Sequence, residues 1–299
     1  MIRLIANPAS GRGRGFRALP AARAAMAAVG VEDVRLTNGP GDEARLVREA
    51  LDDGCTTLAV LGGDGTWSKV AAALVGAGAA GAACRLAPLA AGSGNDFVKS
   101  TGLPASDYGR MAALAVGSGT HRIDLGRVRS AGAERHFLNV AGFGFDAAVL
   151  AYMEGVGWLK GDAVYFYAAL RQLFGFRGCD ARVRVGDADT GWTHQLLIAV
   201  GNGRHFGGSF AICPGALLDD GRLDVVAVGD AGAVRRLALF GAATRGRHLG
   251  APEVRAWRAP AVRIEFRAPP LYETDGELHR ASGAELELDV VPGAVALVA

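Results

Sequence analysis

In the first third of the chain, short runs with strand character alternate with stretches in which apolar residues recur at helical spacing. Ile2 to Ala6, Val34 to Thr37 and Leu58 to Leu61 predict strands, and the last is apolar on both faces, as in a buried parallel sheet. Phe16 to Val29 and Asp42 to Leu51 predict amphipathic helices between these strands. The alternation predicts an α/β domain, closed by one further helix near residues 108–116.

Beyond residue 121 the pattern changes to shorter, alternating strands. The expected strands are Arg122 to Val128, His136 to Ala141, Arg182 to Val185, Gln195 to Val200, Leu223 to Val228, Val262 to Phe266, Leu286 to Val290 and Ala294 to Val298, and the expected helices are about Asp146 to Leu159, Asp162 to Phe174 and Ala231 to Thr244. Many strands with few crossovers predict an antiparallel sandwich or barrel. We therefore expect an α/β domain over residues 1–122 and a β-rich antiparallel sandwich domain over residues 123–299.

The strand Leu58 to Leu61 ends in a glycine-rich turn, Gly62-Gly63-Asp64-Gly65-Thr66, and the next helix begins there. In open α/β folds, ligands bind at the carboxyl ends of the strands. The three glycines free the backbone to point several N–H groups at one anion, and the helix adds the positive end of its dipole. The pattern predicts a phosphate site, although a plain strand-to-helix connection has the same composition.

Three further strand ends carry similar chemistry. A second apolar run ends in Gly92-Ser93-Gly94-Asn95-Asp96, in which Asn95 and Asp96 are good helix N-caps. Ser10 and Gly11 follow the first strand and can donate to phosphate. Thr37 and Asn38 lie at the end of the second strand and could hold ribose or adenine, unless they belong to a plain helix cap. Two anion-shaped turns, each with an aspartate, predict a polyphosphate with its metal.

Composition indicates a cytoplasmic enzyme. The chain has 299 residues, half of them hydrophobic, and a formal net charge of +2, too small to imply a nucleic-acid partner. Its four cysteines show no CxxC spacing, which argues against a zinc site or a disulfide framework. We expect no signal segment, since the chain enters a strand at once, and no transmembrane helix, since no apolar stretch of about 18 residues exists.

The turn Gly62 to Thr66 resembles the signature of the diacylglycerol kinase catalytic-domain family, which includes bacterial lipid kinases and the sphingosine and ceramide kinases. Three further segments resemble the family's motifs in the family's order: Asn7-Pro8-Ala9-Ser10-Gly11, Gly92-Ser93-Gly94-Asn95-Asp96-Phe97 and Thr274-Asp275-Gly276-Glu277. Weaker matches lie between them, at Asn139, Gly142 to Asp146, Gly201 to Gly203, Gly207-Gly208, Pro214, Ala216 and Asp219 to Gly221. The resemblance covers almost the whole chain.

This resemblance implies an α/β nucleotide-binding domain similar to that of NAD kinases and phosphofructokinases, followed by a β-rich lipid domain. It implies ATP and Mg²⁺ as cofactors. It assigns Asp275 as the base that accepts the proton of the acceptor hydroxyl, a role that phosphoryl transfer requires, with Glu277 orienting it or binding metal. Asp64 and Asp96 would act through Mg²⁺, its waters, or hydrogen bonds that hold the loops.

Three other features are open between a functional and an ordinary interpretation. Asp219-Asp220-Gly221 is an ordinary turn by sequence, but in some bacterial family members this segment resembles a structural Mg²⁺ site. The aromatic residues in Gly155 to Leu159 and Ala163 to Phe176 could line an acyl pocket, face a bilayer, or form core. A basic helix near residues 233–249 suits an anionic membrane surface or is simply solvated.

The sequence thus predicts an ATP- and Mg²⁺-dependent lipid kinase with a lipid acceptor presented at a membrane surface, diacylglycerol being the default. The protein would be cytoplasmic and in part peripheral at the inner membrane face; a homodimer is left open. A sphingosine or ceramide kinase is one alternative, and an NAD kinase-like enzyme, which would share the Gly62 to Thr66 turn, is another. A non-catalytic nucleotide- or lipid-binding protein is a third, because Ser68-Lys69 stand where the family commonly has Asn-Glu.

A dinucleotide-binding oxidoreductase is a further rival. Gly13 to Ala18 fits a G-x-G-x-x-A pattern, but six residues separate Ala6 from Gly13, whereas this turn should follow its strand at once. The same pattern recurs at Gly142 to Ala147, which shows how little it means in a chain with 44 glycines.

Overall fold

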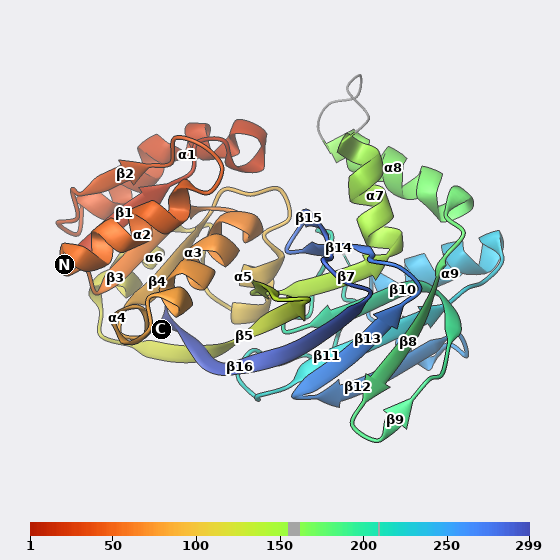
Figure 1. Ribbon diagram of the computed structural model, residues 1–299. Helices are drawn as coiled ribbons and strands as arrows, with labels where there is room; N and C mark the ends of the chain where they lie inside the picture. Colours follow the sequence, from red (N-terminus) through yellow and green to blue (C-terminus); the bar gives the residue numbers. More distant parts are fainter. Residues whose placement is uncertain (155–161, 209) are drawn as a thin grey trace. The chain divides into compact units, whose positions relative to one another are not determined.

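The computed structural model describes residues 1–154, 162–208 and 210–299 (Figure 1). The chain forms two compact units. The first contains Met1–Leu125 and Pro292–Ala299, and the second contains Gly126–Val291. Each unit is described by itself.

The first unit is built on a parallel sheet. Its strands are β1 (Ile2–Ala6), β2 (Val34–Leu36), β3 (Thr57–Gly62) and β4 (Arg85–Ala90), in the order β2-β1-β3-β4. Ala296 and Leu297, from the end of β16 (Glu285–Val298), pair with β4 in parallel and extend this sheet. Every residue of β3 is buried, as the doubly apolar run predicted.

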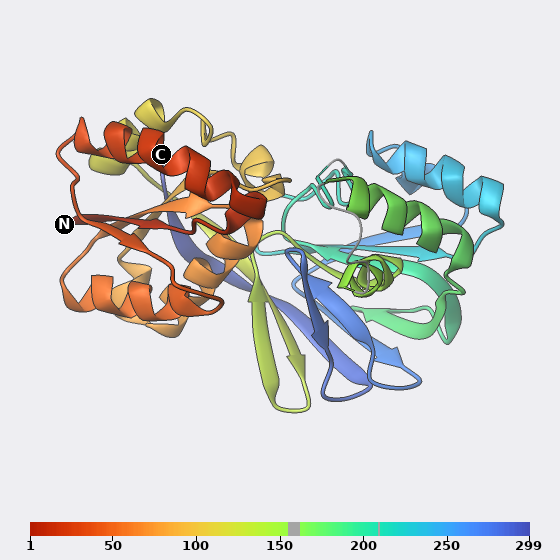
Figure 2. The same cartoon turned by 90° about the horizontal axis from the view of Figure 1, so that it is seen from above.

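Helices cover both faces of this sheet. They are α1 (Ser10–Ala27), α2 (Asp42–Asp52), α3 (Asp64–Gly76), α4 (Ala79–Ala82), α5 (Asp96–Thr101) and α6 (Tyr108–Val116). Helix α1 packs with α6, and α2 packs with α3; Figure 2 shows these pairs on opposite sides of the strands. Met26 and Met111 are fully buried where α1 and α6 meet the sheet.

The second unit is rich in antiparallel strands. These are β5 (Thr120–Ser130) and β16, both shared with the first unit, and β6 (Ala133–Phe137), β7 (Val140–Gly144), β8 (Cys179–Val185), β9 (Ala188–Asp189), β10 (Thr193–Gly201), β11 (Leu223–Gly229), β12 (Val254–Ala259), β13 (Ala261–Phe266), β14 (Leu271–Thr274) and β15 (Glu277–Arg280). Alternate residues face two different cores. Ile198 and Val200 of β10 join a core made almost entirely of strand residues, whereas Leu197 and Ala199 pack in a core shared with helices.

Three helices supply that second core, together with the short 3-10 helix η1 (His248–Gly250). They are α7 (Phe145–Glu154), α8 (Asp162–Gly175) and α9 (Ala233–Ala243). Leu173 of α8 and Leu239 of α9 are buried against residues of β10 and β11, so both helices lie on the same face of the strands.

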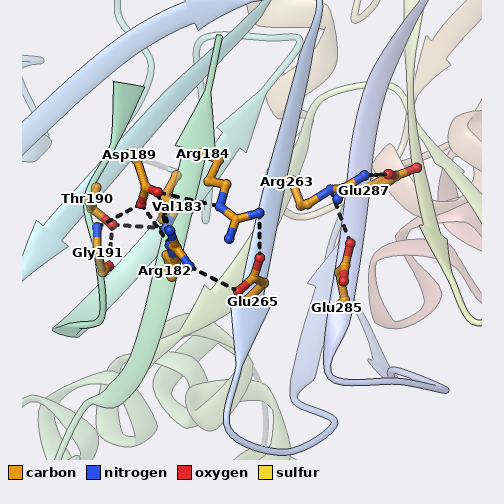
Figure 3. Close-up of polar contacts among 10 residues, drawn as sticks. All are labelled: Arg182, Val183, Arg184, Asp189, Thr190, Gly191, Arg263, Glu265, Glu285 and Glu287. Atoms are coloured by element: carbon orange, nitrogen blue, oxygen red, sulfur yellow. Dashed lines mark hydrogen bonds and ion pairs between the residues drawn. The ribbon is translucent and has the colours of Figure 1, made fainter. Parts of the chain in front are cut away.

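The outer surface of β8, β13 and β16 carries paired charges. In Figure 3, Glu265 of β13 lies between Arg182 and Arg184 of β8, with Arg184 Nη1 3.0 Å from Glu265 Oε1. On the other side of β13, Arg263 pairs with Glu285 and Glu287 of β16. This surface is charged but locally neutralised.

The predicted α/β unit followed by a β-rich sandwich-like unit is confirmed. Two predicted details differ. The predicted strand Ala294 to Val298 continues β16 into the first unit, so the β-rich unit does not keep residues 292–299. The predicted strand His136 to Ala141 is two strands, β6 and β7, with a break at Leu138 and Asn139. The aromatic segment at residues 155–161 lies outside the described residues. Within the described part, no helix is long and apolar enough to span a membrane.

Candidate functional site

In the first unit, the predicted phosphate turns come together at the carboxyl ends of β1, β3 and β4. Asn7 follows β1, and its Nδ2 donates to Thr66 Oγ1 at 3.0 Å, while its Oδ1 accepts from the Ala9 N–H at 3.0 Å. Ser10 Oγ donates to the Ala91 carbonyl at 3.3 Å. Side chains from the first turn therefore bind the other two turns directly.

The glycines of the two main turns contact each other. A Cβ atom on Gly63 would lie 2.8 Å from Gly92 Cα, and one on Gly92 would lie 2.7 Å from Gly63 Cα. Gly11 adopts a left-handed backbone, with φ of 56°, and a Cβ there would lie 2.4 Å from the Ala91 carbonyl oxygen. The backbones pack so closely that only glycine fits at these positions.

Asp64 holds the second turn rather than pointing away from it. Its Oδ1 accepts from the Phe97 N–H at 2.9 Å, at the start of α5. Burial raises the pKa of Asp64, and the nearby charge of Asp96 adds to the effect, while the bond from Phe97 opposes it. Of the three roles predicted for Asp64, the geometry displays the loop-holding one.

The second turn is fixed from within. Asn95 has a left-handed backbone with φ of 52°, and its Oδ1 accepts from the Gly92 N–H at 2.9 Å. Asp96 is buried and pairs with Lys99 at 2.7 Å. Ser93 lies exposed at the tip. The Arg14 guanidinium donates to the Gly92 carbonyl at 3.3 Å, which ties α1 to the same turn.

Thr37, which the sequence also predicted at the carboxyl edge of the parallel sheet, lies there as well. The Thr37 N–H donates to the Ala6 carbonyl at 2.9 Å, directly beside Asn7. The first four N–H groups of a helix have no partner within the helix, and those of α3 belong to Gly63, Asp64, Gly65 and Thr66. The edge thus offers backbone donors and a helix N-terminus, as an anion site requires.

In the second unit, Asp275 occupies the tight turn between β14 and β15. Asp275 and Gly276 have φ of 48° and 86°, the positive values of a two-residue type I′ hairpin. Asp275 Oδ2 accepts from the Leu138 N–H at 2.7 Å, and Oδ1 accepts from the N–H groups of Asn139 and Val140 at 2.9 and 3.1 Å. Three amide donors stabilise the charged carboxylate and fix its position.

The break between β6 and β7 makes this arrangement possible. Because Leu138 and Asn139 leave the strand ladder, their N–H groups are available to Asp275. The Asn139 carbonyl accepts from the N–H groups of Asn202 and Gly203, each at 2.8 Å, and Asn202 Nδ2 donates to the Leu138 carbonyl at 2.8 Å. Three segments that matched the family's pattern, at Asn139, at Gly201 to Gly203 and at Asp275, therefore meet here.

Two buried carboxyl groups lie beside this hairpin. Glu273 is fully buried and its Oε2 accepts from the Gly276 N–H at 2.7 Å, which closes the turn. Asp146, at the start of α7, accepts from the Ala147 N–H at 2.8 Å, and burial raises its pKa to about 7. Oxygens of both groups lie above Gly142, where a Cβ would be 1.6 Å from Asp146 Oδ2 and 2.9 Å from Glu273 Oε1.

Asp146 also reaches an apolar cavity within the second unit. The cavity lies among the sheet, α8 and α9, and it is lined mainly by aromatic and aliphatic side chains, among them Phe210, Leu239 and Phe240. Of the stretch predicted to form an acyl pocket or a bilayer surface, Leu173 lines this cavity, whereas the side chains of Tyr165 and Phe166 lie outside the described residues.

The predicted cation position at Asp219 and Asp220 has a side-chain cation beside it. Arg258 of β12 pairs with Asp220, and its Nε lies 3.2 Å from Asp224 Oδ2. Within residues 1–154, 162–208 and 210–299, no group of three or more His, Cys, Asp or Glu side chains is placed to hold a metal ion. The Mg²⁺ site at Asp219-Asp220 stays a prediction.

Sequence reasoning missed two contributors. Glu273 stands two residues before Asp275, so the alternation of a strand could have placed it near the same face. Strand β14 was not predicted, however, because Pro269 and Pro270 precede it and the segment is only four residues long. The role of the Leu138–Asn139 break had no signal, since both residues fit the strand pattern on either side.

Comparisons with known proteins agree with this arrangement. Residues 1–128 match the family described as the diacylglycerol kinase catalytic domain, and residues 139–299 match the YegS C-terminal NAD kinase beta sandwich-like domain. The chain is 32% identical over 293 residues to the diacylglycerol kinase of Mycobacterium tuberculosis (strain ATCC 25618 / H37Rv), covering 97% of this chain and 92% of that protein. It is 39% identical over 220 residues to the "Probable lipid kinase YegS-like" of Pseudomonas aeruginosa (strain UCBPP-PA14), covering 72% and 68%.

Solved structures show the same fold. A diacylglycerol kinase structure from Bacillus anthracis str. Sterne aligns with a TM-score of 0.71 at 21% identity, over 99% of this chain and 96% of that one. An NAD kinase from Archaeoglobus fulgidus in complex with ATP aligns with a TM-score of 0.56 at 12% identity, over 100% and 94%. The chain therefore belongs to the family of lipid kinases that carry a diacylglycerol kinase catalytic domain.

Proposed function

We propose that this lipid kinase transfers the γ-phosphoryl group of ATP, with Mg²⁺, to a lipid hydroxyl, and that diacylglycerol is the acceptor. The observation that carries the proposal is the Asp275 carboxylate, held by three backbone N–H groups in a two-residue hairpin turn. The curated relatives named diacylglycerol kinase support the acceptor, and the fold shared with an NAD kinase in complex with ATP supports the nucleotide.

In this proposal the first unit binds the nucleotide. The backbone N–H groups at Gly62 to Thr66 and the N-terminus of α3 hold phosphate oxygens, with Ser10, Gly11 and the turn at Gly92 beside them. Asn7 and Asp64 fix the loops through their contacts to Thr66 and Phe97. Thr37 lies at the same edge for the ribose or adenine.

Mg²⁺ supplies positive charge against the phosphate oxygens when it is bound with ATP. Both acids near the phosphate turns already have partners, Asp64 at Phe97 and Asp96 at Lys99. This donor set suits a cation that arrives on the nucleotide and meets these carboxylates through water, the way Mg²⁺ commonly binds.

Asp275 orients the acceptor. The lipid oxygen forms a bond to the γ-phosphorus, the bond from that phosphorus to the bridging oxygen of ADP breaks, and the hydroxyl proton passes to Asp275. Three N–H donors fix the carboxylate in one orientation, which suits a residue that must position the acceptor hydroxyl for transfer. Glu273 is a positioning residue through the Gly276 N–H, and Glu277 follows in the same turn.

Transfer of radiolabelled phosphate from ATP tests the proposal. The acceptors are micellar diacylglycerol, monoacylglycerol, sphingosine and ceramide, with NAD as a soluble acceptor, and Asp275→Asn runs beside the wild type. We expect labelled diacylglycerol that disappears in the variant. Labelled sphingosine or ceramide would correct the acceptor, labelled NAD would move the chain's activity to that of NAD kinases, and bound ATP without any transfer would favour a non-catalytic binding protein.

A further inference from the structure

One face of the second unit exposes large apolar side chains at helical spacing. Tyr167, Leu170 and Phe174 of α8 are 36%, 42% and 58% exposed and lie three and four residues apart. Val234 and Leu237 of α9 are 85% and 51% exposed, again three residues apart. We call these five residues the α8/α9 face.

The two helices are fastened together, so the face is a fixed surface. Arg236 of α9 is buried, and its Nη1 donates to the carbonyls of Leu173 and Phe176 at 3.0 and 2.7 Å, which caps the end of α8. Its guanidinium also pairs with Asp230. The inward sides of both helices are already packed, because Leu173 and Leu239 are in the core. The exposed apolar residues are therefore not unused core positions.

Within the described part of the chain, several arginines near this face lack a carboxylate partner, unlike those on the opposite surface, although Arg235 of α9 pairs with Glu253. Arg171 lies within the exposed side of α8, and Arg177, Arg245 and Arg247 follow the ends of the two helices, all exposed. Among the described residues, none of these four guanidinium groups makes an ion pair with a carboxylate. On the outer surface of β8, β13 and β16, by contrast, each arginine drawn in Figure 3 has a carboxylate partner.

We propose that the α8/α9 face docks on the surface of a bilayer that contains anionic lipid. The inference rests on the proposed function in one respect, that the acceptor is a lipid. Apolar side chains with basic side chains near them suit the boundary between lipid headgroups and acyl chains. Binding there strengthens with the apolar area that is buried and with the attraction of basic groups to anionic lipid. A symmetric contact with a second copy would instead bring the same arginines against each other.

Flotation with vesicles tests the face without any catalysis. Full-length protein, without ATP, is mixed with phosphatidylcholine vesicles or with phosphatidylcholine–phosphatidylglycerol vesicles, at low and at high salt. The double variant Leu170→Ser, Phe174→Ser runs beside Leu217→Ser, a control whose side chain has the same 42% exposure outside this face. We expect binding to the anionic vesicles that weakens with salt and falls about tenfold in the double variant but not in the control.

A charge variant separates the two contributions. Arg171→Gln with Arg245→Gln is expected to reduce binding and to flatten its salt dependence. Equal binding by the wild type and the double variant would overturn the proposal. A wild type that floats with neither vesicle would do the same. Loss of a dimer in the double variant, seen by light scattering with vesicle binding unchanged, would assign the face to self-association instead.

Activity toward a dispersed short-chain acceptor separates this proposal from the proposed function. Leu170 and Phe174 are exposed side chains that the proposed function does not use, so the double variant should keep the wild-type rate on that acceptor. If no acceptor is phosphorylated but the anionic vesicles are still bound through the face, the proposed function fails and the docking surface stands.

Discussion

The two units build their candidate sites from different materials. In the first unit the site is mostly backbone, because Gly63 and Gly92 meet with no room for a side chain and leave N–H groups at the sheet edge. In the second unit the site is mostly carboxyl groups, with Asp275, Glu273 and Asp146 gathered around Gly142 and the hairpin. A polyanion needs donors that do not repel it, whereas an acceptor hydroxyl needs an oxygen that takes its hydrogen bond. The difference is the one that the proposed phosphoryl transfer would require of a nucleotide site and an acceptor site.

The largest expected effect on activity comes from a change to the carboxyl groups of the second unit. Asp275→Asn should lower kcat by about a thousandfold or more, at the upper end of what general acid–base groups contribute. It should leave ATP affinity unchanged, because the proposal assigns nucleotide binding to the glycine turns of the first unit and only the acceptor to Asp275. Phosphate transfer and binding of a fluorescent ATP analogue, measured on the same samples, check both statements.

This variant also carries a stability cost that must be separated from catalysis. Asparagine tolerates the left-handed backbone, but its Nδ2 would face the Leu138 N–H and leave that donor unsatisfied, at a cost of about 1–3 kcal/mol. If the variant keeps wild-type activity but has a lowered thermal midpoint, Asp275 only stabilises the hairpin turn. The carboxyl groups of the second unit would then have no shown part in the reaction.

The next largest effect is expected from a change to the closely packed glycine turns of the first unit. Gly63→Ala places a Cβ 2.8 Å from Gly92 Cα, so the two turns must separate. We expect a loss of about 1–3 kcal/mol of unfolding free energy, the usual cost of overpacking, and at least about a tenfold loss of ATP affinity, which corresponds to about 1.4 kcal/mol. Calorimetric titration with ATP measures the affinity.

Gly76→Ala is the matched control for this change. Gly76 lies in the same helix α3, and a Cβ there would meet nothing within 4 Å. It should therefore bind ATP like the wild type. Similar losses in both variants would mean that the close contact at Gly63 and Gly92 does not shape the nucleotide site.

A smaller effect concerns the acidity of the second unit. Burial raises the pKa of Asp146 from 3.8 to about 7, so the folded chain keeps a proton that the unfolded chain releases. The associated stability is fully present below the unfolded pKa and is lost as pH rises toward 7, at about 1.4 kcal/mol for each pH unit between the two pKa values. The thermal midpoint of the wild type should therefore fall between about pH 4 and about pH 7 and level off above, and that of Asp146→Asn should change less. Identical pH dependence in the two proteins would show that Asp146 is not the titrating group.

The smallest expected effect concerns the acidic turn at Asp219 and Asp220. Because Arg258 balances Asp220 and Asp224, EDTA should leave the wild-type thermal midpoint unchanged, and Arg258→Gln should lower the unfolding free energy by about 1 kcal/mol or less. Mg²⁺ should raise the midpoint of the variant. Arg263→Gln, which removes a similarly exposed guanidinium from the outer strands, controls for general loss of surface pairing. If EDTA lowers the thermal midpoint of the wild type, that result would support the predicted Mg²⁺ site at Asp219 and Asp220.

Much of the nucleotide half could be predicted, since its information is local. Leu58 to Leu61 is apolar, the glycine-rich turn Gly62 to Thr66 follows at once, and helix α3 begins within that turn. One short segment therefore predicts the strand, the turn and the candidate phosphate site. The spatial meeting of Gly63 with Gly92 could be anticipated only in outline, because parallel strands end at one edge.

The acceptor half depends on contacts that are distant in sequence. Asp275 was identified by resemblance, but its partners Leu138 to Val140 lie 135 to 137 residues away, in a region predicted as an unbroken strand. Ala294 to Val298 was predicted as a strand, yet its apolar residues do not specify which sheet they join. Which distant strands pair depends on how their side chains pack in the complete core. The local sequence pattern of one strand does not contain that information.

The return of β16 to β4 has a consequence for how the protein is made. The first unit is interrupted in sequence, and its sheet is completed only by Ala296 and Leu297. During synthesis, β4 therefore leaves the ribosome with one edge unpaired until residues 296 and 297 emerge. Unpaired strand edges recruit other strands, so removal of residues 292–299 should make the chain prone to aggregation.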